Sequence, residues 1–206
     1  MNRILRTSAV ATAVLCTALV AAAPADAAAP PAKPLAAAPP AKPLAAAKLA
    51  VTGRIDLRLA ALKRFSVALG EAKQVQAAHR GTLTTLIGDQ TAGLTALRAK
   101  VGAETTTAAI KVDAQHMVDD YRVFILTGPK VRLTAAIDTE EAVIDRLHGQ
   151  AGVDDAKLDA VRAGLDGKVD TLLAIAPGPD GDVIRAQVKT VRQAAKTART
   201  QLKAFK

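Results

Sequence analysis

Three histidines and several carboxylates are the residues of this chain whose types could support acid–base or metal chemistry. His79, His116 and His148 lie far apart, and none occurs in an HExxH or other paired spacing that would hold zinc. Asp119 and Asp120 are adjacent, and a second acidic group lies further on: Asp138, Glu140, Glu141 and Asp145. On helices such carboxylates usually form a solvated face. We expect no catalytic residue, no metal site and no cofactor, and therefore a protein that is not an enzyme.

A row of basic residues near the C-terminus is the best candidate for a binding surface. Residues 183–206 contain seven Lys and Arg and no acid, whereas residues 104–182 contain eight basic and fifteen acidic residues. The basic residues recur in steps of four and three, which places them along one side of a helix. The candidate polyanion-binding residues are Arg185, Lys189, Arg192, Lys196, Arg199 and Lys203.

This row has two interpretations, and the sequence leaves both open. The row could pair internally with acidic residues of the neighbouring helices: Asp138, Glu140, Glu141, Asp154, Asp155 and Asp159. It could instead bind an anionic lipid surface, a cell-wall polymer or nucleic acid. Sequence-specific nucleic-acid binding is the weakest of these, because Phe205 is the only aromatic residue in the segment and single-strand binders need aromatic stacking platforms.

The composition and the apolar periodicity predict an all-α fold. Half of the residues are apolar but only 2% are aromatic, which favours thin helices packed through narrow stripes. Four helical segments are predicted: 49–101, 105–149, 154–175 and 183–205. In the first, His79 is expected to be a tolerated residue on the apolar stripe. The last has a heptad seam: Ile184, Val188, Val191, Ala195, Ala198, Leu202 and Phe205. We expect an elongated antiparallel helical bundle with coiled-coil-like packing, in which the last helix folds back at the breaker sequence PGPDGD.

The stretch YRVFILTGPKVRLT, residues 121–134, contains the only Tyr of the chain and a Gly-Pro pair between two apolar stripes. Proline removes an amide donor and crowds the preceding helical turn, so we expect a kink or restart at Pro129. We expect Phe124 to be buried against the first helix. If Tyr121 and Phe124 were exposed instead, they would form a binding patch.

The N-terminus predicts export. Arg3 and Arg6 precede a short apolar run, and small residues at 25–27 suit signal-peptide cleavage, so residues 1–27 are predicted to be a signal peptide rather than an uncleaved anchor. Residues 28–48 contain the repeat PPAKPLAAA twice and are predicted to be a semi-extended spacer or a tail without function. The helical domain is predicted to span 49–206. Cys16, the only cysteine, would be lost on cleavage, which excludes disulfides.

The segment YRVFILTGPKVRLT, behind a signal peptide and within an Ala- and Lys-rich helical body, resembles uncharacterised secreted proteins of high-GC Gram-positive bacteria. That resemblance implies secretion and a helical fold over residues 49–206, but it implies no activity. Our leading hypothesis is an exported, non-enzymatic structural or interaction module, secreted or held at the cell envelope. The alternative is a polyanion-binding module that uses the basic row. A cell-wall polymer, an anionic membrane surface, another envelope protein and a second copy of the chain are the partners considered.

Overall fold

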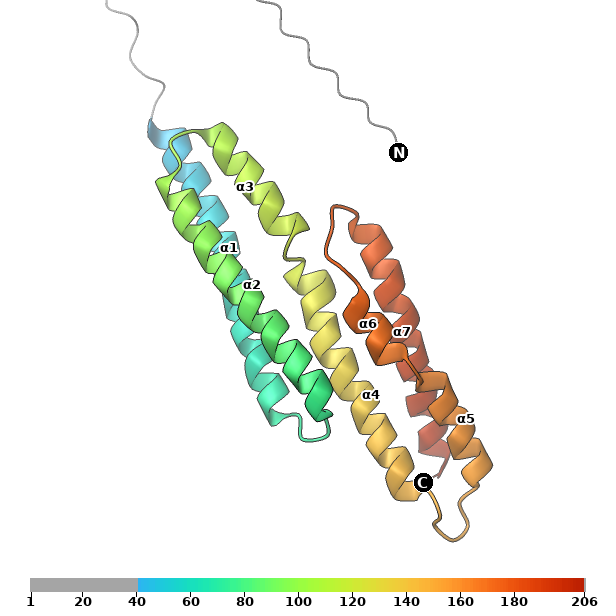
Figure 1. Ribbon diagram of the computed structural model, residues 1–206. Coiled ribbons are helices and arrows are strands. Elements are labelled where there is room, and N and C mark those ends of the chain that lie inside the picture. The colour runs from blue at the N-terminus through green and yellow to red at the C-terminus, as the bar shows by residue number, and fades with distance from the viewer. Residues whose placement is uncertain (1–40, 206) are drawn as a thin grey trace, which may run out of the picture. The chain divides into compact units, whose positions relative to one another are not determined.

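The structure is a computed structural model that describes residues 41–205. All regular secondary structure in this range is helical, as predicted, and the range contains no strand (Figure 1). The elements in chain order are α1 (Ala41–Glu71), α2 (Ala77–Ala103), α3 (Thr107–Asp119), the π-helical turn η1 (Val123–Thr127), α4 (Gly128–Leu147), α5 (Asp155–Leu165), α6 (Lys168–Ala174), α7 (Gly181–Leu202) and the 3-10 turn η2 (Lys203–Phe205).

The first helix begins earlier than predicted. α1 starts at Ala41, so residues 41–48 of the predicted spacer are helical, while the predicted signal peptide and residues 28–40 lie outside the described residues. Pro43 is compatible with this start, because the amides of a first helical turn have no partner within the helix. The Lys48 ammonium donates to the carbonyl of Gly102 at 2.6 Å, which ties the start of α1 to the end of α2.

The prediction of one helix over 49–101 is wrong. The chain reverses at residues 72–76, and α1 and α2 pack against each other as an antiparallel hairpin. Arg80 stabilises the reversal by donating to the carbonyls of Leu69, in the last turn of α1, and of Ala72, directly after it. Val75 is buried within the turn, which is why the apolar periodicity continued through it.

α4 lies between two groups of helices (Figure 1). Its Val131 side chain joins a hydrophobic core formed mainly with α1, α2 and α3. Ile137 and Ile144 of the same helix join a second core formed with α5, α6 and α7. Both groups therefore pack against opposite sides of one helix.

The direction of the chain changes before Pro129, at Arg122. This residue is in the left-handed region, with φ of 40°, and separates α3 from η1. η1 then continues directly into α4, where Pro129 occupies the first turn and needs no amide partner. The predicted restart at Pro129 is therefore confirmed, since α4 begins at Gly128, but the chain changes direction earlier, at Arg122.

The prediction that Phe124 is buried is also wrong, since 51% of this residue is exposed. The aromatic residue at the contact between α1 and α4 is Phe65. A Cβ atom on Gly128 would lie 2.7 Å from Cζ of the Phe65 ring, so the absence of a side chain at Gly128 lets the ring approach the backbone. The guanidinium of Arg58 instead lies over the Phe124 ring, with its Cζ atom 5.4 Å from the centre of that ring.

Residues 121–134 form a joint that connects the two groups of helices through polar contacts. Arg122 donates to the carbonyl of Gly178 at 2.7 Å and to that of Pro179, and so holds the PGPDGD loop. The buried Lys130 ammonium donates to the carbonyls of Leu173 and Ile175 at 2.8 and 2.7 Å, at the C-terminal end of α6. Burial lowers the pKa of Lys130. The segment with the strongest local sequence signal is thus structural.

The C-terminal helices follow the prediction more closely. Asp154 caps α5 and Asp180 caps α7 by accepting backbone amide hydrogens, and α7 folds back onto α4, α5 and α6. The predicted helix 154–175 is interrupted at Gly167, whose φ is 63°. α4 and α5 are antiparallel, but α7 starts beside Ile125 and ends beside Glu140 and Val143, so α4 and α7 run in the same direction. The antiparallel arrangement therefore holds for some neighbours only.

Candidate functional site

The basic row lies on the exposed side of α7. The seam residues from Ile184 to Leu202 are buried against the neighbouring helices, as predicted, whereas Phe205 is only half-buried. Each basic residue follows a seam residue by one position, which rotates its side chain by about 100° around the helix. All six candidates are exposed: Arg185, Lys189, Arg192, Lys196, Arg199 and Lys203.

Internal pairing does not account for this row. Within residues 41–205, one of the six candidates forms an ion pair: Arg185 contacts Asp182 of the same helix at 2.6 Å. Most of the acids proposed as partners pair elsewhere. Asp138 contacts His79, while Asp154 contacts Lys157. The remaining five cations of the row therefore face solvent without a carboxylate within ion-pair distance in the described part of the chain.

The row borders α4 at its C-terminal end. Arg199 and Lys203 line a slot of about 390 Å³ between α7 and α4. The residues that α4 contributes to this slot share one stripe of that helix: Ala136, Thr139, Glu140 and Val143. Glu140 is the only acid that residues 41–205 contribute to this lining.

Two further cations, outside the row, lie over aromatic rings of other elements. Arg132 is one helical turn before Ala136 on α4, so it shares the stripe that lines the slot. Its guanidinium lies over the Phe65 ring of α1, 5.8 Å from the ring centre. Arg58 covers Phe124 in the same way, and its pKa is lowered by burial and by the neighbouring Arg54. No local pattern in the sequence predicts these contacts, because each joins residues of different helices.

Glu140 is a buried acid in the wall of the slot that Arg199 and Lys203 also line. Only 7% of the residue is exposed, and its Oε2 atom has no hydrogen-bond partner among the described residues. Desolvation raises the pKa of Glu140 from 4.5 to about 7, and the positive charge of Arg199 opposes that rise. Its ionisation therefore falls within the range around neutral pH.

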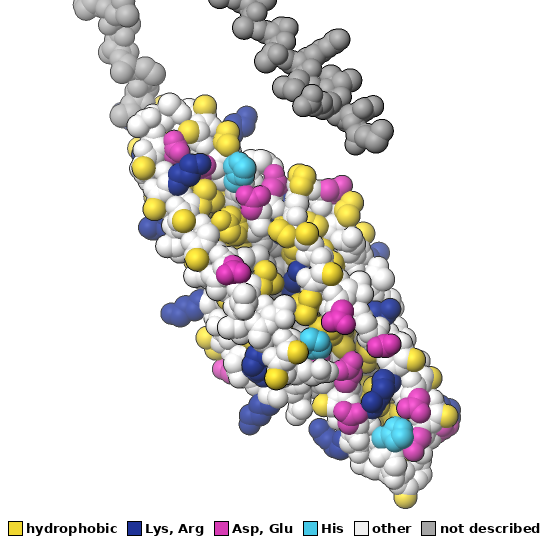
Figure 2. All heavy atoms as spheres, viewed as in Figure 1, with side chains coloured by type: hydrophobic (Ala, Val, Ile, Leu, Met, Phe, Trp, Pro, Cys, Tyr) yellow, Lys and Arg dark blue, Asp and Glu magenta, His cyan; other side chains and the backbone are white. Residues whose placement is uncertain are grey.

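A second groove, of about 620 Å³, is acidic and lies between the turn at 72–76, α4 and α5. Figure 2 shows acidic side chains gathered over the region where α4 and α5 lie in Figure 1. His79 was predicted to be a tolerated residue on the apolar stripe, but it makes a specific contact. Its Nδ1 atom is 2.9 Å from Oδ1 of the buried Asp138. The amide of Gln76 donates to the same carboxylate at 2.9 Å. These contacts fasten the hairpin of α1 and α2 to α4.

The carboxylates that sequence spacing grouped together are separated in the structure. Asp138 faces the α1–α2 hairpin, whereas Glu140 faces α7. Asp119 accepts from Arg122 at 2.9 Å, and Asp120 lies 3.2 Å from Nδ1 of the exposed His116. Among residues 41–205 there is no group of three or more His, Cys, Asp or Glu suited to hold a metal ion.

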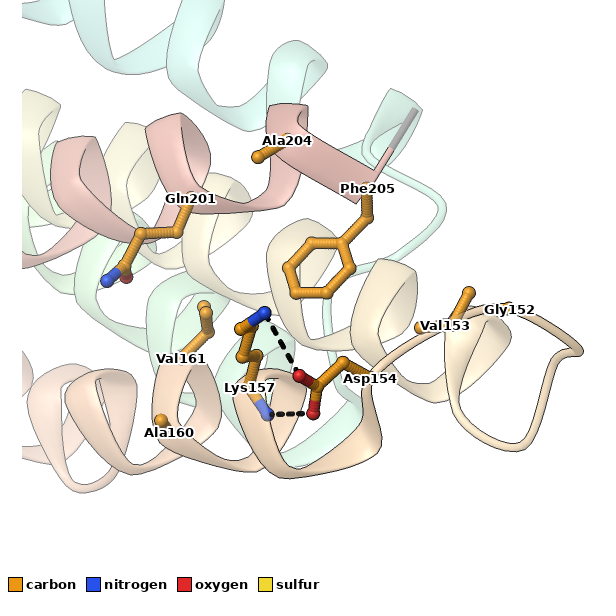
Figure 3. Close-up of a pocket in the computed structure, with 9 residues that line it drawn as sticks. All are labelled: Gly152, Val153, Asp154, Lys157, Ala160, Val161, Gln201, Ala204 and Phe205. Carbon is orange, nitrogen blue, oxygen red and sulfur yellow. Dashed lines mark hydrogen bonds and ion pairs between the residues drawn. The ribbon is translucent and has the colours of Figure 1, made fainter.

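A further pocket, of about 600 Å³, lies where α5 begins and η2 ends the described chain (Figure 3). The Phe205 ring faces Asp154 and Lys157, which form an ion pair at 3.0 Å. Because its two charged groups pair with each other, this pocket presents no unsatisfied charge to a ligand.

Comparison of the chain with known protein families, with curated proteins and with solved structures gives no match. None of the helices between residues 41 and 205 combines the length and apolar character needed to cross a membrane. The interpretation of function therefore depends on the described surface, on which the basic row of α7 places six exposed cations along one helix.

Proposed function

We propose that this chain is an exported, non-enzymatic interaction module whose basic row on α7 binds a polyanionic partner at the cell envelope. The observation that carries the proposal is the row of exposed cations from Lys189 to Lys203 that lack carboxylate partners within residues 41–205. Solvent-exposed charges that are not neutralised internally create a local positive potential and attract counter-ions.

The spacing of the row favours a polymer or a surface over a single small anion. From Arg185 to Lys203 the row extends for about 27 Å, with one charge every 5 Å or so, given the rise of 1.5 Å per residue. A single exposed ion pair contributes at most about 1 kcal/mol, so useful affinity needs several contacts at once. An anionic chain with repeating phosphates or carboxylates can make them.

The packing of α7 favours a wall polymer over insertion into a lipid bilayer. The apolar side of this helix, including Val188, Val191 and Leu202, is buried against its neighbours. An amphipathic helix that inserts into lipid needs that side to be free. The row could still lie flat on an anionic membrane. The binding experiment must therefore distinguish a wall polymer from lipid headgroups as the source of the anionic groups.

Export and envelope association rest on the predicted signal peptide of residues 1–27 and on the resemblance described for residues 121–134. Cell fractionation tests this part of the proposal. Recovery of the mature chain from the envelope or the medium would support it, and recovery from the cytoplasm alone would contradict it.

Binding is tested by replacing Arg192, Lys196 and Arg199 together with glutamine. The probes are poly(glycerol phosphate), vesicles containing phosphatidylglycerol, and single-stranded DNA. We expect the triple substitution to weaken polymer binding by about 10- to 100-fold at low salt, since three charge contacts are lost. Binding to vesicles alone would assign the row to the membrane surface instead.

The matched control removes three positive charges elsewhere. Lys63, Arg64 and Lys73 are exposed and lie in or just after α1, away from the row. Replacing these three with glutamine changes the net charge by the same amount. Equal loss of binding in both triple variants would mean that total charge, rather than the row, drives the interaction.

A further inference from the structure

The slot between α4 and α7 contains charges of both signs. Arg199 of α7 and Lys203, directly after that helix, lie on one side and Glu140 of α4 on the other. The remaining lining residues are Thr139 and three apolar ones: Ala136, Val143 and Leu202. α5 and α6 contribute no residue to the lining. Within residues 41–205, the charged groups that face Glu140 across the slot are Arg199 and Lys203.

Glu140 is not explained as a structural residue. A buried carboxylate loses its hydration, and proteins normally compensate for this loss with hydrogen bonds or a paired cation. Yet the buried Oε2 atom of Glu140 has no hydrogen-bond partner within residues 41–205, and no Lys or Arg in that range lies within ion-pair distance of the carboxylate. Arg199 acts on it only as a nearby charge.

A purely anionic polymer would not favour an acid at this position. The negative charge of Glu140 would repel phosphates bound by Arg199 and Lys203, since the effective dielectric constant is low in a partly buried site. A ligand that also carries a positive group would be attracted by both signs. Its ammonium could donate hydrogen bonds to Glu140 while its anionic group contacts the two cations.

We infer that this slot is a binding site for a zwitterionic group in which an ammonium and a phosphate lie a few bonds apart. The inference rests on the proposed function, because Arg199 and Lys203 belong to the basic row. It narrows the partner from any polyanion to an anionic polymer or lipid surface that carries amino substituents. The apolar wall suits the short hydrocarbon link between the two charges.

Two soluble phosphodiesters test the inference by calorimetric titration. Glycerophosphorylethanolamine carries both charges, whereas glycerophosphorylglycerol has a hydroxyl in place of the ammonium. We expect the full chain to bind the first about ten-fold more tightly at pH 8, the size expected for one charge-assisted hydrogen bond. Glu140→Gln, which keeps the shape of the side chain, is expected to bring the ratio close to one. An equal preference in both proteins would overturn the inference.

The pH dependence of the unmodified protein gives a second test that needs no variant. The preference for the ammonium compound should disappear as the pH falls from 8.5 to 5.5, because Glu140 becomes protonated and loses its charge. Neither phosphodiester titrates in this range, so a preference that is constant with pH would contradict the assignment to Glu140.

A variant that spares the slot separates this inference from the proposed function. Replacing Lys189, Arg192 and Lys196 with glutamine should weaken poly(glycerol phosphate) binding and leave the preference between the phosphodiesters unchanged. If polymer binding is lost but no preference exists in the unmodified protein, the inference fails and the proposed function stands. If the preference exists but polymer binding does not change, the proposed function fails.

Calorimetric titration also distinguishes a polymer from a lipid surface as the source of the zwitterionic group. Poly(glycerol phosphate) esterified with alanine carries ammonium groups on a polymer, and phosphatidylethanolamine carries them on a lipid surface. Tighter binding to the alanylated polymer than to the bare polymer assigns the slot to a polymer substituent, whereas tighter binding to vesicles with phosphatidylethanolamine assigns it to a headgroup. No gain from either, with no preference between the soluble probes, would overturn the inference.

Discussion

Replacing Glu140 with glutamine should stabilise the protein above neutral pH and reduce the dependence of its stability on pH. The pKa of Glu140 is raised from 4.5 to about 7 by desolvation, so the folded state binds this proton more tightly than the unfolded state. Stability linked to this residue is therefore complete below pH 4.5 and is lost progressively as the pH rises to about 7.

The size of this effect follows from the shift. A rise of the pKa from 4.5 to about 7 corresponds to an upper limit of roughly 3 kcal/mol, since each pKa unit is worth about 1.4 kcal/mol. Water can enter the slot and Arg199 is close, so we expect a smaller gain of about 1–3 kcal/mol in the free energy of unfolding of the variant at pH 8. At pH 4 the neutral carboxyl and the amide should give nearly equal stabilities.

Urea denaturation of both proteins between pH 4 and 8.5, followed by circular dichroism, measures this difference. Glu71→Gln is the matched control, because Glu71 is exposed at the end of α1 and its substitution should change stability by less than about 0.5 kcal/mol. Parallel pH profiles for the unmodified protein and Glu140→Gln would refute the assignment of a desolvated carboxylate at this position.

Three further predictions concern the helices that position the site. Asp138→Asn should lower the free energy of unfolding by about 1–3 kcal/mol, since a buried carboxylate with two partners is lost, whereas the exposed control Asp120→Asn should change it by less than about 0.5 kcal/mol; equal effects in urea denaturation would contradict this. Gly88→Ala, in open space, should raise the melting temperature through a helix-propensity gain of up to about 1 kcal/mol, while Gly128→Ala should lower it because the new Cβ meets an aromatic ring of α1; the same sign for both would count against the packing described. Arg122→Leu should accelerate amide hydrogen exchange in residues 178–184, where two carbonyls lose their donor, and unchanged exchange would show that the loop is held otherwise.

The last helix could be predicted because local signals agree there. Its seam repeats in regular steps, and Asp180 provides a cap at the start. Apolar periodicity predicted α1 and α2 as one helix, because Val75 is buried in the turn between them and continues the apolar pattern. The hydrogen bonds from Arg80 to the carbonyls of Leu69 and Ala72 join residues across the turn, and apolar periodicity cannot predict them.

The change of chain direction at Arg122 was not predicted, for a different reason. Pro129 is the stronger local signal, but proline fits the first turn of a helix, while Arg122 adopts a left-handed conformation that sequence patterns assign to glycine or asparagine. For the candidate site, the row on α7 could be predicted from one helix alone. Arg132 and Glu140 could not be added to it, since their role depends on how α4 lies between α1 and α7.

Binding to poly(glycerol phosphate) as a function of salt concentration tests the central proposal most directly. If all six cations of the row contact anionic groups, a plot of the logarithm of the binding constant against that of salt concentration should have a slope of roughly −5 on the duplex-DNA scale and about −4 for a flexible chain. Replacing Arg192, Lys196 and Arg199 with glutamine should reduce that slope by about 2 to 3. A slope and an affinity that are unchanged by the triple substitution would show that the basic row of α7 is only a solvated face.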